Sequence, residues 1–422
     1  MNIRKLITAA LCVVMLLAVL TGCRNSAVSE PDAASASPAS SAGTEETTAG
    51  PDASGSPAAA EDNAASGDET APEGEIATSL GANAAKAAAY FEPDEVIMTV
   101  NGVDYDWQKF FYLNNYYVNY LEYYNGAFAS WDDTVQDGAT VKEYVLDSSR
   151  DWVLYDAAIR TNAEKLGVSL SEEDKAEIRD NIQETVERYG GEEAFQEQLE
   201  KNFCTMELYT DLSETTALAN KVFAELYGEH GEKLSDEEVA EYTSLDGYLM
   251  AKHILILNSK TDDEGKDVAL EGEELAAARA KIDEIKAQLD ACPPDQIAAK
   301  FDELMAEYSE DPGTEMYPGG YLFQDGNMVQ EFEDATKALE IGQYSDVVET
   351  DYGFHIIYRL PIDFDAVPSA YSYYVQSGED QYTLRYITAL GQFDSVVASW
   401  QDSLDVTYGK AYEQIDFEKM FA

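Results

Sequence analysis

The spacing of apolar residues predicts a long, mostly helical region that begins shortly after residue 90. A loosely alternating stretch, 95–100, ends at Asn101-Gly102, a dipeptide typical of tight turns. Beyond it, apolar and aromatic residues recur about every 3.6 positions, which is the spacing of amphipathic helices. We expect helices near 107–121, 141–166, 171–189, 192–227 and 235–242. Ser171, followed three residues later by Asp174, has the pattern of a helix N-terminal cap.

The pattern changes at Leu249, where a strand-length apolar run extends to Leu257. An acidic loop, 258–271, precedes two predicted helices, a turn-rich segment, a short strand at 321–323, a helix near 329–339 and two closing strands. The order β-α-α-β-α-β-β therefore fills this segment. Two further helical stretches are expected in the tail, near 382–403 and 409–420.

The first 22 residues have the pattern of a secretory signal. Arg4 and Lys5 precede an apolar run, 6–20, that is too short for an ordinary membrane span. The run ends in Leu-Thr-Gly-Cys23, which resembles the lipobox of bacterial lipoproteins. The resemblance implies acylation of Cys23 and a cell-membrane, lipid-anchored location on the extracytoplasmic side. An ordinary signal peptide with an accidental cysteine is the alternative.

Residues 23–90 are expected to be a disordered acidic tether. They are rich in Ala, Ser, Gly and Pro, and every aromatic residue of the chain lies at or after Tyr90. Such a composition cannot bury enough apolar surface to offset the entropy lost on ordering.

The net charge of −55 excludes a nucleic-acid-binding function, because a polyanion repels phosphate backbones. It also disfavours contact with anionic lipid headgroups, so we expect membrane contact through the lipid anchor only. Cys204 and Cys292 are not in a CxxC motif and are predicted to be unpaired, although a disulfide between them stays open. The three histidines lack metal-ligand spacing, and no metal or cofactor is expected.

Residues 252–359 resemble the parvulin family of peptidyl-prolyl isomerases. The resemblance is carried by Lys-His-Ile-Leu-Ile at 252–256, Tyr-Ser-Glu-Asp-Pro-Gly-Thr at 308–314, Gly-Gly-Tyr-Leu-Phe at 319–323, Gly-Asn-Met-Val-Gln-Glu-Phe at 326–332, and the segments 342–345 and 348–357. It implies a four-stranded antiparallel sheet surrounded by helices, and rotamase activity, the cis-trans isomerisation of X-Pro peptide bonds.

The resemblance also implies the residues of the active site. Carried over position by position, the catalytic residues are His253, His355, Asp311 and Tyr352, with the two histidines side by side. The apolar slot for the proline ring is lined by Met328, Phe332 and Leu322. Taken singly, each histidine could be an ordinary core residue, the apolar pair could be helix core, and Asp311 could simply begin a turn.

Two departures from the family pattern affect these expectations. The segment after Gly319-Gly320 is about two residues shorter than usual, which leaves the slot wall at Leu322 and the extent of isomerase activity open. The loop 258–271 is acidic, whereas phosphate-directed parvulins carry clustered basic residues there. Selectivity for phosphorylated Ser/Thr-Pro is therefore not expected.

The flanking segments resemble the chaperone region of secreted foldases of the PrsA and SurA type. The resemblance rests on Val-Ile-Met-Thr-Val-Asn-Gly-Val at 96–103, before an aromatic-rich helix, and Leu-Ser-Asp-Glu-Glu-Val at 234–239. It implies an α+β chain in which a parvulin-like domain is inserted into a helical chaperone domain. The expected organisation is a signal at 1–22, a tether at 23–90, chaperone helices at 91–246, a parvulin-like domain at 247–361 and completing helices at 362–422.

The resulting hypothesis is a membrane-anchored extracytoplasmic foldase. Its partners would be unfolded or partly folded exported proteins with X-Pro bonds, which it would isomerise and chaperone. The alternative is a non-catalytic holdase that keeps the parvulin fold as a peptide clamp. A solute-binding lipoprotein would share the anchor, but it would need two α/β lobes that the helical flanks do not indicate.

Overall fold

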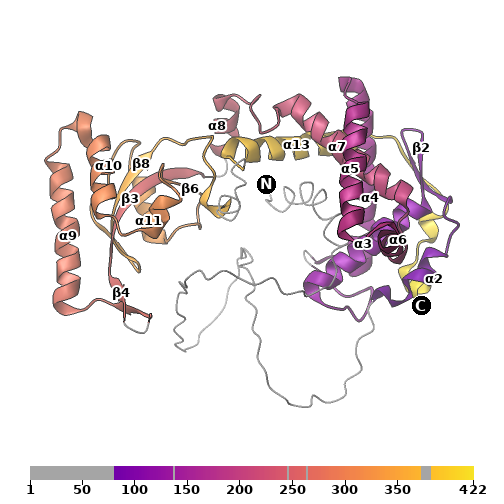
Figure 1. Ribbon diagram of the computed structural model, residues 1–422, viewed down its shortest axis with the longest axis horizontal. Coiled ribbons are helices and arrows are strands. Elements are labelled where there is room, and N and C mark those ends of the chain that lie inside the picture. The colour runs from indigo at the N-terminus through magenta and orange to yellow at the C-terminus, as the bar shows by residue number, and fades with distance from the viewer. Residues whose placement is uncertain (1–79, 136–137, 245–246, 263–264, 372–381) are drawn as a thin grey trace, which may run out of the picture.

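The computed structural model describes residues 80–422, apart from residues 136–137, 245–246, 263–264 and 372–381. The described chain is an α+β protein with a mostly helical body and a smaller sheet domain (Figure 1). The predicted signal segment, Cys23 and the predicted tether up to residue 79 lie outside the described residues.

The helical body is formed by segments from both sides of the sheet domain. Its helices are α2 Ala84–Ala88, α3 Trp107–Asn125, α4 Val141–Leu166, α5 Glu172–Arg188, α6 Glu192–Lys201, α7 Met206–Tyr227, α8 Asp236–Ser244, α13 Leu384–Asp402 and α14 Phe417–Phe421. Its strands are β1 Val96–Val100, β2 Val103–Asp106 and β9 Val406–Tyr408, and its 3-10 turns include η2 Leu80–Asn83 and η7 Tyr412–Gln414. The predicted cap at Ser171 is confirmed. Its side chain accepts from the backbone N–H of Asp174, and the Asp174 carboxylate accepts from the backbone N–H of Ser171.

Two predicted helices differ from the structure. The stretch 192–227 is divided between α6 and α7 by Phe203, whose φ of 59° is left-handed. Thr205 then caps α7 by accepting from the N–H of Leu208. The helix predicted at 409–420 is wrong, because that stretch follows β9 and holds only η7 and the short α14.

The two ends of the described chain meet in the helical body. Strand β9 pairs antiparallel with β1, which also pairs with β2. The Asn83 side-chain amide donates to the Phe421 carbonyl at 2.7 Å, and Ala84 and Ala87 are buried. The expectation of disorder up to residue 90 is therefore wrong for residues 80–90. Alanine helices too short to fold alone are ordered here by packing against the other end of the chain.

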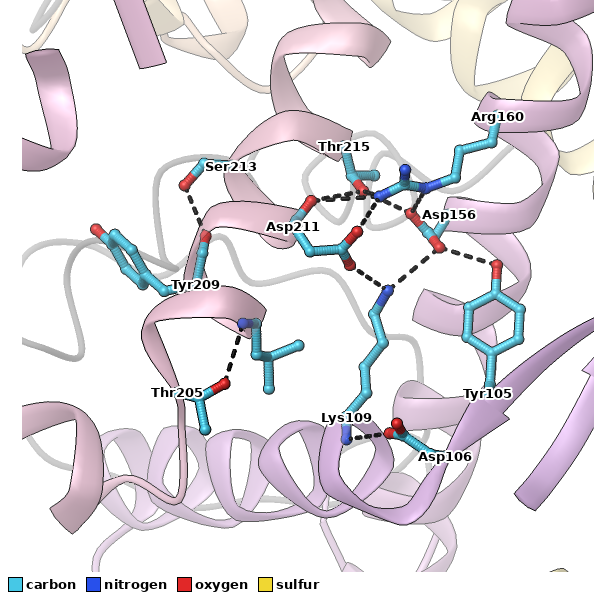
Figure 2. Close-up of polar contacts among 11 residues, drawn as sticks. Tyr105, Asp106, Lys109, Asp156, Arg160, Thr205, Tyr209, Asp211, Ser213 and Thr215 are labelled. Carbon is cyan, nitrogen blue, oxygen red and sulfur yellow. Dashed lines mark hydrogen bonds and ion pairs between the residues drawn. The ribbon is translucent and has the colours of Figure 1, made fainter. Parts of the chain in front are cut away.

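A network of charged side chains connects β2, α3, α4 and α7 (Figure 2). Asp156, 1% exposed, accepts from Arg160 at 2.7 Å and lies 3.3 Å from the Lys109 ammonium. It also accepts from the hydroxyls of Tyr105 and Thr215, at 2.9 and 2.5 Å. Asp211 pairs with the same two cations at 2.7 and 2.8 Å. A buried carboxylate with this many partners fixes the relative positions of four elements.

Both folded-domain cysteines are free, as predicted. Cys204 is buried in the core of the helical body, and burial raises the pKa of its thiol to about 12. Cys292 lies at the end of α9 in the sheet domain and is partly exposed.

The sheet domain contains a four-stranded antiparallel sheet in the order β6-β3-β8-β7. Its elements are β3 Leu249–Leu257, β4 Ser259–Thr261, β5 Asp267–Ala269, α9 Gly272–Asp290, η4 Pro294–Gln296, α10 Ile297–Tyr308, η5 Pro312–Glu315, β6 Tyr321–Phe323, α11 Gln330–Ala338, β7 Val348–Thr350 and β8 Gly353–Leu360. The predicted acidic loop contains the β4–β5 hairpin, which was missed because its strands are short and polar.

The two faces of the sheet are covered by different helices. Ile254 and Ile256 of β3, with Phe354 and Ile356 of β8, pack against α9 and α10. Helix α11 covers the other face. Because side chains alternate along a strand, the residues between these apolar ones face α11.

The sheet domain packs on the helical body through Met250 and Leu322. Both are buried in one cluster with Ile159 of α4, Val222 of α7 and Phe393 of α13. Helix α13 lies between the sheet domain and the other long helices (Figure 1).

Candidate active site

The structure brings the two predicted histidines together on the α11 side of the sheet. His253 lies in β3 and His355 in β8, and the register pairs His355 with Leu255. The histidines are therefore diagonal neighbours on one face. Their Nδ1 atoms are 2.9 Å apart, and their rings stack with centroids 5.1 Å apart. Both side chains are buried.

A continuous chain of hydrogen bonds passes through both rings. His253 Nε2 lies 2.8 Å from Asp311 Oδ2, and His355 Nε2 lies 2.8 Å from Thr350 Oγ1. One arrangement of protons satisfies every contact with both rings neutral. The Thr350 hydroxyl donates to His355, His355 donates to His253, and His253 donates to the carboxylate of Asp311.

Asp311 is held by the turn that follows α10. Its Oδ1 accepts from the backbone N–H of Gly313 at 3.0 Å, so it caps η5. Its Oδ2 accepts from the Tyr321 hydroxyl at 2.7 Å. Asp311 therefore begins a turn and also belongs to the hydrogen-bond chain of the histidines. A Cβ at Gly313 would stand 1.9 Å from the Tyr321 hydroxyl, so only glycine allows this approach.

Helix α11 covers the imidazoles with an aromatic ring. Phe332 meets His253 and His355 edge to face, with centroid separations of 5.2 and 5.9 Å. Phe323 lies 5.8 Å from Phe332, and the half-buried Met328 packs in the same cluster. An apolar surface thus adjoins a polar network, as the isomerisation of a proline amide requires.

The predicted slot wall at Leu322 is wrong. Side chains of β6 alternate, so Tyr321 and Phe323 face the histidines while Leu322 points to the helical body. Leu322 is fully buried there. Phe323, which was not among the predicted residues, lies on the histidine side, where it is fully buried and packs against Phe332.

Among the described residues, Tyr352 meets the histidine network only through its backbone. It lies in the turn between β7 and β8 and is 60% exposed. Its backbone N–H donates to Thr350 Oγ1 at 3.1 Å, so Thr350, and not Tyr352, is the polar group bonded to His355. Thr350 and Tyr321 were not predicted as site residues, but the sequence pattern could have indicated them. Thr350 ends β7 at the tight turn into β8, the strand that carries His355. Tyr321 is two positions before Phe323 in β6, so both side chains lie on the same face of the sheet.

The electrostatics favour a charged Asp311 and a neutral His355. Burial, together with the neighbouring His253, lowers the pKa of His355 to about 3. Burial alone would raise the pKa of Asp311, but hydrogen bonds from His253 and Tyr321 outweigh it and lower that pKa to about 2. Burial and the Asp311 charge raise the pKa of Tyr321, which keeps its hydroxyl a donor. Within the described residues, no group of three His, Cys, Asp or Glu side chains is arranged to hold a metal ion.

The free energy of unfolding is expected to fall as the pH falls from about 6.5 to 3. In this window the unfolded chain binds a proton at His355 that the folded chain excludes. The slope is about 1.4 kcal/mol per pH unit from this group. Urea unfolding at pH 4, 5 and 6 should therefore show a shallower pH dependence in His355→Gln. Equal slopes in the wild type and His355→Gln would contradict a buried neutral imidazole.

Comparisons with known proteins agree with this geometry. Residues 253–360 match the rotamase family described as the PPIC-type PPIase domain. A foldase protein PrsA from Geobacillus kaustophilus is 38% identical over 130 residues, which are 30% of this chain and 36% of that protein. A foldase protein PrsA from Staphylococcus aureus is 29% identical over 194 residues, which are 45% of this chain and 53% of that protein.

A solved structure of PrsA from Bacillus cereus, at 20% identity, covers 69% of this chain and 99% of its own, with a TM-score of 0.27. The curated relatives are matched over about a third to a half of their length. Residues 253–360 are thus a parvulin-type peptidyl-prolyl isomerase domain, and the chain that carries them is similar to the PrsA foldases.

Proposed function

We propose that the chain is an extracytoplasmic foldase that isomerises X-Pro bonds in exported proteins and holds unfolded chains on its helical body. The observation that carries this proposal is the chain Thr350–His355–His253–Asp311 beneath the ring of Phe332. It lies inside the segment that matches the PPIC-type family.

The site has the parts that the reaction needs. Rotation about an X-Pro amide must overcome roughly 18–20 kcal/mol of lost resonance, and no covalent bond is broken. The half-buried Met328 and the edge of Phe332 would offer apolar contact to a pyrrolidine ring, with the fully buried Phe323 packed behind Phe332. The buried hydrogen-bond chain holds the imidazoles in one orientation, so their dipoles need not reorganise when the amide twists.

The proposed location is the outer side of the cell membrane, with Cys23 as the acylated anchor. The signal-like segment and lipobox support it, as does the likeness to PrsA foldases. Among the residues that the structure describes, no helix is long and apolar enough to cross a bilayer. Two acyl chains, at about 0.8 kcal/mol per buried methylene, would hold even this polyanionic protein at a membrane.

The chain from residue 24 onward is expected to accelerate isomerisation of a short proline reporter peptide. His253→Ala should slow that reaction about tenfold, or about 1.4 kcal/mol, because it breaks the link between Asp311 and His355. His230→Ala, on the exposed surface, is the matched control and should change nothing. Suppression of aggregation of an unfolded protein, measured in parallel, should survive both changes.

The outcomes separate the two candidate functions. If the unaltered chain suppresses aggregation but does not accelerate isomerisation, the holdase alternative holds. If it does neither, the foldase proposal fails.

A further inference from the structure

A long groove runs between α5 and α7 of the helical body, far along the chain from the histidine pair. Its volume is about 530 Å³, and it is lined from Asp174 to Arg188 on α5 and from Tyr209 to Lys221 on α7. At 1.5 Å per residue the α5 side rises about 21 Å. That length matches about six residues of extended polypeptide at 3.3 Å each.

Apart from Thr185, the buried residues that line the groove and form its floor are apolar or aromatic. Ile178 and Leu212 are 8% and 1% exposed, Tyr209 is buried beside them, and Ile182 is half-buried. Binding at this floor removes apolar side chains of a ligand from water, and this burial stabilises the complex.

The rim of the groove is mainly acidic. Glu177 and Glu184 line it and are exposed. At one end of the groove, the Lys221 ammonium pairs with the Asp174 carboxylate at 2.6 Å. Arg188 is the basic residue at the other end. Over their whole length, α5 has seven acidic and three basic residues, and α7 has four acidic residues and one basic residue. An apolar ligand that enters here therefore meets a negative potential, which attracts cations and repels anions.

We infer that this groove binds a segment of unfolded client protein in which apolar side chains are interspersed with Lys or Arg. The inference rests on the proposed chaperone function and names the class of client that this function favours. The apolar floor takes the apolar side chains, and the Glu177 and Glu184 carboxylates meet the cations. An anionic membrane surface is excluded as the occupant by the same negative potential.

Fluorescence anisotropy with three labelled peptides of equal length tests the inference on the chain from residue 24 onward. We expect a Leu-Lys peptide to bind at least about tenfold more tightly than a Leu-Glu or a Ser-Lys peptide, a difference of about 1.4 kcal/mol. The double variant Glu177→Lys/Glu184→Lys should weaken Leu-Lys binding about tenfold. Ala217→Phe, which fills the groove from α7, should weaken it similarly.

The matched control is Asp180→Lys/Glu187→Lys. It makes the same charge change at exposed positions of α5 outside the groove, and screening over about 8 Å at physiological salt should limit its effect to about twofold.

Equal weakening by both charge pairs, equal binding of the Leu-Lys and Leu-Glu peptides, or undiminished binding in Ala217→Phe would each overturn the inference. Melting curves of all variants should be recorded to check that they fold. Isomerisation of the short reporter by these variants should equal the wild type, so failure here is distinguishable from failure of the foldase proposal.

Discussion

Phe332→Ala is expected to lower kcat/KM for isomerisation of a proline reporter peptide about 100-fold. The Phe332 ring is 4% exposed and meets both imidazoles edge to face. Under the proposed function, its removal would take away the main apolar contact for the pyrrolidine ring and admit water to the hydrogen-bond chain below. A factor of 100 corresponds to about 2.7 kcal/mol of lost transition-state stabilisation.

A control must separate loss of the slot from loss of stability. Phe301→Leu alters a buried ring on the opposite face of the same sheet, against α9 and α10. Both variants should be assayed at a temperature where circular dichroism shows them folded. Phe301→Leu should keep kcat/KM within about twofold, equivalent to about 0.4 kcal/mol. Similar losses in both variants would mean that Phe332 acts only through packing.

Asp156→Ala is expected to reduce the free energy of unfolding of the helical body by about 3–5 kcal/mol. The substitution leaves Lys109 and Arg160 with Asp211 as their remaining carboxylate in this network. It also removes the acceptor for the Tyr105 hydroxyl. Urea unfolding, followed by tryptophan fluorescence, measures the change.

Asp147→Ala is the matched control in the same helix. Asp147 pairs with Arg150 at 2.7 Å, but its side chain is 56% exposed, and exposed pairs contribute only about 0–1 kcal/mol. Burial alone would raise the pKa of Asp156, but Lys109 and Arg160 outweigh burial and lower that pKa. The contribution of Asp156 to the free energy of unfolding is therefore fully present above the pKa of an unfolded aspartate. It is lost as the pH falls through the lower pKa of Asp156 in the folded chain. A loss in Asp156→Ala no larger than in Asp147→Ala would contradict a central role for the network.

Local patterns predicted much of the fold. The cap at Ser171, the turn at Asn101-Gly102 and the apolar run at 249–257 depend on neighbouring residues, and the structure has the corresponding elements. The order of strands and helices in the sheet domain followed from the apolar and turn pattern, apart from the β4–β5 hairpin. The family motifs selected His253, His355 and Asp311, which the structure joins by hydrogen bonds, although their catalytic roles remain predictions.

By itself, the sequence determined most of the element types, the family of residues 253–360 and three polar residues that belong to one network. Only the tertiary structure decided that Leu322 faces the helical body, that Thr350 instead of Tyr352 contacts His355, and that residues 80–90 fold against the C-terminus. These outcomes depend on contacts between segments distant in sequence. A three-residue strand such as β6 shows too short an alternation to reveal which face is buried, and alanine-rich helices order only when a partner surface is present.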